Sequence, residues 1–253
     1  MQLWPADSTR HNGLVLSRDE FIYTGHVAAR KDDSRYRLAQ LAGERASILD
    51  VGCAVGYIGE YLRHTPPTRW LGGIELDEGA AALARPHYDQ LIVGSVEDKK
   101  VWDQVGRDVD AMIFGDVLEH TSDPVRVLRM AQEHLADDGM VIISMPNIAH
   151  FRVRLRLLAG RFDYEEWGIM DRTHLRFFTL ASARKMLRSS GFDVLHTEPI
   201  LSFPPATVKS VGSRAALAVR ARARNVVGTL WPTAFAKQFI LVGARQEESL
   251  KRT

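Results

Sequence analysis

Two carboxylates and one imidazole stand at a spacing that suits acid-base or metal chemistry. Asp116, Glu119 and His120 are at i, i+3 and i+4, so a helical turn would bring all three side chains to one face. Such a set could act as a general base or bind a divalent cation such as Mg²⁺ or Zn²⁺. His174, in a second polar segment at 171–179, could reach the same cleft as a fourth ligand. Asp116, His120 and His174 are therefore candidate catalytic residues, and the four together a candidate metal site.

The scaffold for these residues is an alternation of strands and helices that begins at Ala46. Such alternation predicts a parallel, doubly wound α/β sheet. The Asp116 segment would follow the fourth strand and His174 would precede the helix before the sixth. The expected strands are 46–51, 69–75, 90–94, 110–114, 140–145, 192–198 and 235–245. The expected helices are 57–64, 78–85, 101–105, 124–135 and 181–190, with one or two more within 17–42.

A glycine-rich turn follows the first expected strand. Asp50 ends an apolar run, and Gly52 and Gly56 come directly after it. Because glycine has no Cβ, this turn lets a ligand approach the backbone closely. The second expected strand ends at Glu75, where an open α/β sheet can use a carboxylate to accept both ribose hydroxyls of a nucleoside. The sequence therefore predicts an adenosine-containing cofactor.

The spacing of the turn separates two cofactors. A nicotinamide-dinucleotide motif, G-x-G-x-x-G, would need glycine at positions that hold Ala54 and Tyr57. The chain instead matches D-x-G-x-G-x-G with Ala54 at the middle glycine, and it resembles motif I of class I S-adenosylmethionine (SAM)-dependent methyltransferases. Segments 71–77, 110–120 and 135–144 extend the resemblance in the same order. It implies SAM as cofactor and a Rossmann-like sheet of six parallel strands plus an antiparallel seventh, with helices on both faces and a helical insertion between strands six and seven.

The resemblance also implies roles for single residues. Asp50 and Gly52 would hold the methionine end of SAM, Glu75 the ribose, and Ser95 the adenine. Ser95 stands where related enzymes often carry Asp, so the adenine contact could come from Glu97 instead. The expected cofactor residues are Asp50, Gly52, Cys53, Ala54, Gly56, Glu75, Leu76, Ser95, Val96 and Gly115.

The Asp-x-x-Glu-His segment and His174 together resemble two O-methyltransferase groups, the small-RNA 2′-O-methyltransferases and the ubiquinone-pathway catechol O-methyltransferases. Both are associated with a divalent metal. The resemblance implies that Asp116, Glu119, His120 and His174 hold a metal that lowers the pKa of an acceptor hydroxyl. Asp116 departs from these groups, which usually have Glu there. A base or acceptor-site role without metal, and a structural role, stay open.

Segment 146–180 follows the fifth strand, where acceptor-binding loops belong in this fold. It resembles bacterial methyltransferases of glycan, polysaccharide and secondary-metabolite biosynthesis. The resemblance implies O-methylation of a hydroxyl on a sugar, glycoside or related metabolite. The alternatives are an N-methyltransferase for a small-molecule amine, an NAD-dependent oxidoreductase and a SAM-binding regulatory subunit. The expected acceptor contacts are Asn147, His150, Tyr164, Trp167 and Arg172.

Composition limits the remaining possibilities. The chain has 253 residues and a net charge of +2, too small to indicate a nucleic-acid partner by itself. Cys53 is the only cysteine, and no run resembles a signal peptide or a membrane span of about 20 apolar residues. A cytoplasmic location is the resulting expectation. We divide the chain into an N-terminal segment with cap helices (1–45) and a SAM-dependent methyltransferase domain (46–253), with acceptor loops at 146–180 and a helical insertion at 199–234.

The expected insertion is basic, and three interpretations of it stay open. It could be an interfacial helix in peripheral contact with a membrane. It could recognise phosphate on a nucleotide-activated or RNA acceptor. It could also be the solvated face of a lid. The sequence leaves the oligomeric state open too. The basic residues are Arg214, Arg220, Arg222 and Arg224.

Overall fold

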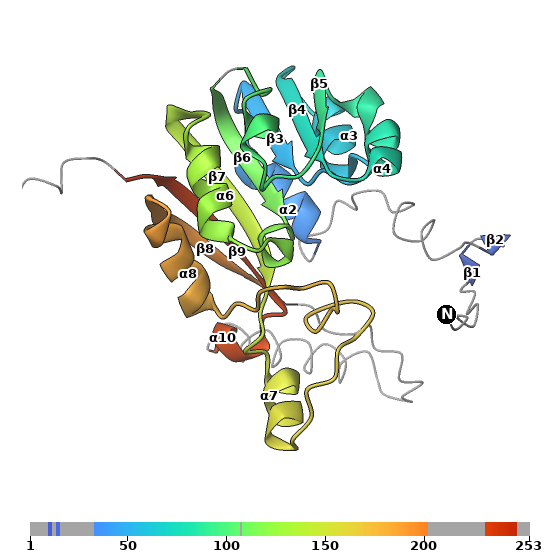
Figure 1. The fold of residues 1–253 in the computed structure, drawn as a ribbon, viewed down its shortest axis with the longest axis vertical. Coiled ribbons are helices and arrows are strands. Elements are labelled where there is room, and N and C mark those ends of the chain that lie inside the picture. Colours follow the sequence, from blue (N-terminus) through green and yellow to red (C-terminus); the bar gives the residue numbers. More distant parts are fainter. Residues whose placement is uncertain (1–9, 12–13, 16–32, 107, 202–230, 247–253) are drawn as a thin grey trace, which may run out of the picture.

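The computed structural model describes residues 10–11, 14–15, 33–106, 108–201 and 231–246. Its centre is a seven-stranded sheet in the order β5-β4-β3-β6-β7-β9-β8 (Figure 1). Strand β9 lies antiparallel between β7 and β8, while the other six strands run parallel to one another. The predicted fold class is therefore confirmed. The strands are β3 (Ser47–Val51), β4 (Trp70–Glu75), β5 (Gln90–Val93), β6 (Val109–Gly115), β7 (Leu135–Pro146), β8 (Phe192–Ile200) and β9 (Gln238–Arg245), with a separate pair, β1 (Arg10–His11) and β2 (Leu14–Val15).

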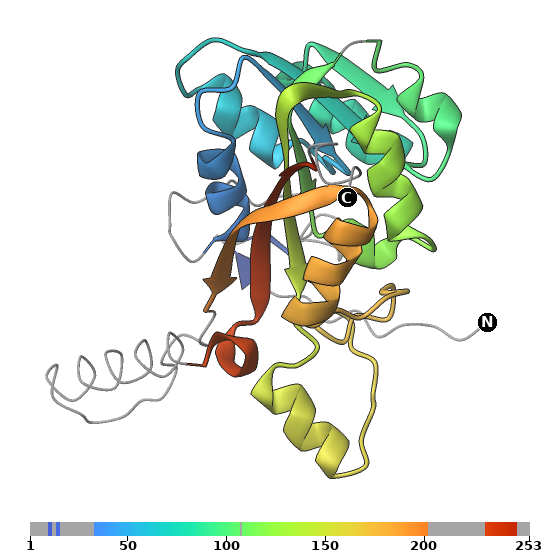
Figure 2. The ribbon, with the colours of Figure 1, turned by 90° about the vertical axis from the view of Figure 1, so that its left-hand side faces the viewer.

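Helices cover both faces of the sheet (Figure 2). Successive strand residues point to opposite faces, so Leu49 and Val51 belong to one core while Ile48 belongs to the other. One face carries α2 (Ser34–Ala42), α3 (Tyr57–Arg63) and α4 (Glu78–Ala84), followed by the short η1 (Arg85–His87). The other face carries α5 (Lys99–Trp102), α6 (Pro124–Gln132) and α8 (Leu180–Ser189).

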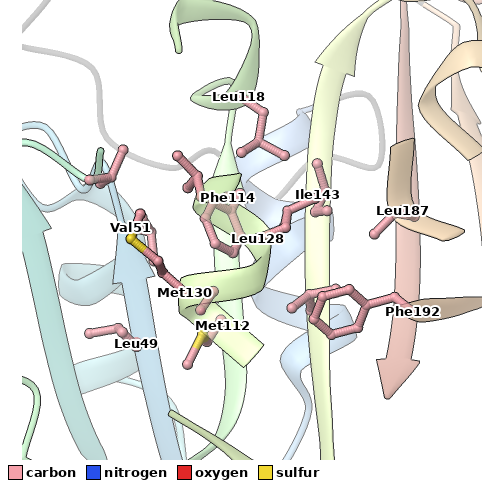
Figure 3. Packing of buried hydrophobic residues seen from close by; sticks show 14 of the residues in the cluster. Leu49, Val51, Met112, Phe114, Leu118, Leu128, Met130, Ile143, Leu187 and Phe192 are labelled. Atoms are coloured by element: carbon pink, nitrogen blue, oxygen red, sulfur yellow. The ribbon is translucent and has the colours of Figure 1, made fainter. Parts of the chain in front are cut away.

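The core on the α6 side fixes the end of β6, where the candidate site begins. Phe114 of β6 and Leu128 of α6 are fully buried, and Leu118 packs with them (Figure 3). Burial of each such side chain contributes about 1.5–3 kcal/mol. Leu118 is the first residue of the short 3₁₀ turn η2 (Leu118–His120). Its burial therefore holds the adjacent Glu119 and His120 in place.

Several predicted boundaries differ from the structure; the strand expected at 140–145, for example, is β7 (Leu135–Pro146). The helix expected at 124–135 ends at Gln132, because Leu135 already pairs with Val109 as the first residue of β7. The strand expected at 235–245 begins at Gln238, because a short helix, α10 (Pro232–Phe235), occupies its start. The helix expected at 101–105 is the single turn α5, which begins after its cap Asp98.

The segment predicted to be acceptor loops contains a helix that the sequence did not lead us to expect. Helix α7 (Phe151–Leu158) begins after His150, whose side chain accepts a hydrogen bond from the Arg152 N–H. Its apolar residues alternate with arginines. This two-residue period is typical of a strand and gives no sign of a helix. Helix α7 lies beyond the end of the sheet at which β7 finishes (Figure 1).

Some of the sequence predictions concern residues that lie outside the described part of the chain. This holds for the arginines of the basic insertion and for most of the helices expected within 17–42, of which α2 is described. The proposed domain boundary at residue 46 stays a prediction; Leu38 and Ala42 of α2 pack in the same core as Ile48. Among the described residues, the helices are all too short or too polar to cross a bilayer.

Candidate active site

The turn after β3 is held against the end of β4 by backbone and carboxylate contacts. Gly52, Ala54 and Gly56 all have left-handed backbone, with φ of +71°, +48° and +87°. The Gly52 N–H donates to the carbonyl of Ile74 at 2.8 Å. The Ala54 N–H donates to Oε2 of Glu75 at 2.7 Å. The Glu75 carboxylate is thereby fixed beside the turn, and its ribose role stays a prediction.

Asp50, the last polar residue of β3, is buried beside a tyrosine. The Tyr88 hydroxyl donates to Asp50 Oδ2 at 2.6 Å and accepts a hydrogen bond from the Gly59 N–H at 3.2 Å. Burial raises the pKa of the Asp50 carboxyl from its ordinary value of 3.8 to about 7. Tyr88 thus links β3, α3 and the end of η1 behind the turn.

Two cavities lie at the C-terminal ends of β3, β4 and β6, and Gly52 and Asp116 line both of them. Their volumes are about 190 Å³ and about 270 Å³. All expected cofactor residues except Gly56 line one or the other, so we call them the two cofactor cavities. Gly56 instead packs on α4, where an added Cβ would lie 3.1 Å from Ala84 Cα. The larger of the two cavities has Glu75, Leu76, Ser95 and Val96, and the smaller has Asp50, Cys53, Ala54 and Gly115.

Glu97, the alternative adenine contact, lines the larger of these cavities. Its Oε1 accepts hydrogen bonds from the N–H groups of Ser122 at 2.9 Å and Asp123 at 3.2 Å, and from the Ser122 hydroxyl. The hydrogen bond from Ser122 lowers the pKa of Glu97. Glu97 therefore ties the wall of the cavity to the start of α6, while Ser95 lies in the same wall.

Glu119, His120 and His174 come together at the end of β6, and we call them the Glu119 cluster. Each offers one ligand atom, and these atoms lie within 4.8 Å of one another. The two imidazole rings meet edge to face, with centroids 4.9 Å apart. His174 reaches η2 because the N–H groups of Leu175 and Arg176 both donate to the Glu119 carbonyl. The predicted convergence of these two distant segments is thus present in the fold.

Backbone carbonyls orient both imidazoles of the cluster. Nδ1 of His120 lies 3.2 Å from the Thr173 carbonyl, and Nδ1 of His174 lies 3.2 Å from the Ile169 carbonyl. A carbonyl only accepts, so each Nδ1 must carry the proton, and the neutral ring then has its lone pair on Nε2. Burial, and the nearby His120, lower the pKa of His174. The cluster therefore presents Nε2 lone pairs suited to a metal or a proton.

Glu119 is the most unusual member of the cluster. Its side chain is 1% exposed, and neither carboxylate oxygen has a hydrogen-bond partner among the described residues. Burial, together with the nearby Asp116, raises the pKa of Glu119 well above its ordinary value. A buried carboxyl without a partner is costly. This group is therefore suited to a cation or a proton.

Asp116 lies beside the cluster but does not join it. Its Oδ1 accepts a hydrogen bond from Ser144 at 2.8 Å, and the Gln238 amide donates to Oδ1 and Oδ2 at 2.7 and 2.6 Å. Its backbone is left-handed, with φ of +56°, so the helical turn expected to align it with Glu119 and His120 begins only at Leu118. Three of the four expected metal ligands come together, and the fourth, Asp116, lines both cofactor cavities instead.

The expected acceptor contacts fall into two groups. His150 and Trp167 line a third cavity of about 480 Å³ beside α7, which we call the α7 cavity. Asn147 is fully buried, and its amide donates to the carbonyls of Thr233 and Ala236, so the fold itself uses it. The other two do not line this cavity: the Arg172 guanidinium pairs with Glu166, and the Tyr164 ring lies near Phe162 and Phe177.

Several residues around the site were not predicted from the sequence. Ser144 interrupts the apolar run of β7, and that interruption could have indicated it. Gln238 carried no signal, because its partner Asp116 is 122 residues away. Tyr88, which binds Asp50, and Arg35, whose guanidinium lies 4.9 Å from the Tyr57 ring centre at the smaller cofactor cavity, carried none either.

Cavities at the carboxyl ends of parallel strands, with a carboxylate at the second strand, define a nucleoside-binding α/β protein. The family model described as "Methyltransferase domain" matches residues 23–197. The chain belongs to this methyltransferase family and is a SAM-dependent methyltransferase. This result excludes the nicotinamide-dependent alternative.

Curated and solved relatives agree with that assignment. The ubiquinone biosynthesis O-methyltransferase of Neisseria meningitidis serogroup A is 28% identical over 167 residues, which span 63% of this chain and 68% of the relative. A chain from the complex of the Haloferax volcanii Trm112 methyltransferase activator with a methyltransferase superposes with a TM-score of 0.61, at 18% identity, over 91% of this chain and 94% of that one. A SAM-dependent methyltransferase from Archaeoglobus fulgidus gives 0.58, at 14% identity, over 83% and 92%. These last two similarities describe the fold.

Proposed function

We propose that this enzyme transfers the methyl group of SAM to a hydroxyl of a small-molecule acceptor, a sugar, glycoside or related metabolite. The Glu119 cluster would remove the hydroxyl proton. The observation that carries the proposal is the buried Glu119 carboxylate, which lacks a partner among the described residues and lies with two imidazoles next to the cofactor cavities. The curated relatives are themselves named O-methyltransferases, which supports the same acceptor chemistry.

The Glu119 cluster fits a divalent cation. Glu119, His120 and His174 would hold it, and two imidazoles with one carboxylate favour a transition metal such as Zn²⁺ over Mg²⁺. A bound cation lowers the pKa of a coordinated hydroxyl and orients it. Asp116 is left out of this set because Ser144 and Gln238 already occupy its oxygens.

The chain's own residues would do the positioning. Glu75 would hold the ribose of the cofactor and the glycine turn its methionine end, and Asp116 lines both cofactor cavities. The carbonyls of Thr173 and Ile169 keep each Nε2 of the cluster available. Because SAM carries an activated methyl group, the protein mainly has to align the acceptor and accept its proton.

N-methylation is less well supported, because a neutral amine needs no base or metal to attack a methyl group, so the Glu119 cluster would have no task.

The acceptor class can be measured with labelled SAM and two probes of similar size, catechol and benzylamine. We expect labelled methyl in catechol and little in benzylamine. Transfer to catechol should fall at least 100-fold in Glu119→Gln and in His174→Ala, as for loss of a general base. The control is His64→Ala, which alters an exposed histidine at the end of α3.

Two outcomes would contradict the proposal. One is preferential transfer to benzylamine. The other is unchanged transfer to catechol in both cluster variants, which would show that neither Glu119 nor His174 takes part in the reaction. Retained binding of S-adenosylhomocysteine (SAH) in each variant would show that the fold and the cofactor site are intact.

A further inference from the structure

The α7 cavity carries positive charge that the described residues do not neutralise. Arg152, Arg156 and Lys237 line it together with one acid, Glu165. Arg156 pairs with Glu165. Within the described part of the chain, Arg152 and Lys237 have no carboxylate within ion-pair distance. Two exposed cationic side chains therefore line the same cavity.

His150 also lines this cavity, and both charges affect its imidazole. It is 7% exposed and lines the cavity, with Nδ1 accepting the N–H of Arg152 at 3.4 Å. Burial lowers the pKa of His150, and the charges of Arg152 and then Lys237 lower it further. Both charges thus act on the one buried imidazole that lines the cavity. Arg152 and Lys237 are themselves exposed, so an anion in solvent can reach both of them.

The rest of the lining is apolar or aromatic. Phe151 and Trp167 contribute rings, and Val153, Ile169 and Met170 contribute aliphatic surface. The volume of about 480 Å³ lies within the range of about 300–1,000 Å³ that is usual for small-molecule sites. A cavity of this kind suits a ligand with a compact body, such as a sugar ring, and one anionic group.

The α7 cavity shares its walls with the reaction site. Ile169 lines the cavity, and its carbonyl holds Nδ1 of His174 in the Glu119 cluster. Lys237 lines it as well, and the next residue, Gln238, donates to Asp116 between the cofactor cavities. An acceptor anchored in this cavity would therefore contact the same short segments that orient the candidate catalytic residues.

We infer that the α7 cavity binds the phosphate group of a phosphorylated acceptor, so that the substrate class is a sugar phosphate or a related phosphate monoester. The inference rests on the proposed function, because it names the acceptor of that reaction. A phosphate monoester carries a charge of about −1.5 to −2 at pH 7, which matches the two unpaired cations Arg152 and Lys237. A single carboxylate would leave one of them unneutralised.

Calorimetric titration of three related probes into the SAH-loaded protein tests this directly, because binding is measured without methyl transfer. Glucose 1-phosphate carries the phosphate, glucuronate carries a carboxylate, and glucose carries no charge. We expect saturable binding of glucose 1-phosphate, at least tenfold weaker binding of glucuronate, and none of glucose. Arg152→Gln and Lys237→Gln should each weaken glucose 1-phosphate about tenfold, as for loss of a charge-assisted hydrogen bond.

Arg154→Gln is the matched control, since Arg154 is an exposed arginine of the same helix that does not line the cavity. It should change the affinity less than twofold. Equal losses in Arg154→Gln and Arg152→Gln, binding of glucuronate as tight as that of glucose 1-phosphate, or no binding of glucose 1-phosphate would each overturn the inference. Metal binding and methyl transfer to catechol do not enter these readouts, so failure here is distinguishable from failure of the proposed function.

Discussion

The side-chain amide of Gln238 donates to both carboxylate oxygens of Asp116, at 2.7 and 2.6 Å. The two residues are 122 positions apart and join the first residue of β9 to the turn after β6. Ser144 of β7 donates to the same carboxylate. The antiparallel strand therefore helps to hold the residue that lies between the two cofactor cavities.

The first prediction concerns this contact. Gln238→Leu keeps the size of the side chain but removes the donor, and burial already raises the pKa of Asp116. We expect the free energy of unfolding to fall by about 1–3 kcal/mol and SAH binding to weaken. Gln246→Leu is the control, because its amide contacts Asp193 on the exposed edge of the fold; it should change stability by less than about 0.5 kcal/mol. Equal effects of the two substitutions in urea unfolding would contradict this assignment.

The second prediction concerns the glycine turn. An added Cβ at Gly52 would lie 2.5 Å from Val117 Cγ2, whereas at Gly160, with the same φ of +71°, nothing lies within 4 Å. Both alanine variants pay the left-handed backbone penalty of about 1–2 kcal/mol, but only Gly52→Ala adds a clash of about 1–3 kcal/mol. Gly52→Ala should therefore be the less stable variant in urea and the weaker SAH binder in calorimetry.

The clash itself can be tested by a second substitution. Val117→Ala removes the methyl group that the new Cβ would meet, so the double variant should recover part of the lost stability. A double variant no more stable than Gly52→Ala would show that Val117 does not limit the turn.

The third prediction concerns Asp50, whose pKa burial raises to about 7. Between pH 4 and pH 7 the unfolded state has released the proton that the folded state keeps, so stability must fall as pH rises through this window. Each unit of the pKa difference corresponds to about 1.4 kcal/mol. Asp50→Asn keeps an acceptor for Tyr88 and should make this slope shallower, because the buried carboxyls of Glu119 and Asp116 still contribute to it. The variant should be more stable than wild type at pH 7.5 but not at pH 4.

Urea unfolding without cofactor at pH 4, 5.5 and 7.5 measures this slope. Asp137→Asn changes a fully exposed carboxylate and should keep the wild-type slope. Parallel pH profiles for wild type and Asp50→Asn would show that Asp50 does not titrate in the window assigned to it.

Many helices and strands could be predicted from the sequence, because the signals that start and end them lie within a few neighbouring residues. The apolar run before Gly52 predicted β3, and Asp123 with Pro124 predicted the start of α6. Helix α7 was missed because its arginines obscure a helical period. The spacing from Asp116 to His120 suggested one helical face, but the left-handed backbone of Asp116 precludes it.

The candidate site also has a part that the sequence predicted and a part that it did not. Motif positions located the cofactor turn, Glu75 and the three members of the Glu119 cluster. The partners that hold them, Tyr88 and Gln238, come from distant segments, and only the folded chain brings them together. The charge in the α7 cavity was equally hidden, because Arg152 and Lys237 are far apart in sequence and neither matches a motif.

We proposed that the Glu119 cluster binds a divalent cation that promotes deprotonation of the acceptor hydroxyl. The most direct measurement is a calorimetric titration of Zn²⁺ into metal-free, SAH-loaded protein, comparing wild type with Glu119→Gln, His174→Ala and the control His64→Ala. We predict saturable binding of one Zn²⁺ to wild type and His64→Ala, weakened at least 100-fold in both cluster variants. Two results would contradict this proposal. One is that wild type binds SAH but no Zn²⁺, and the other is that all four proteins bind Zn²⁺ with equal affinity.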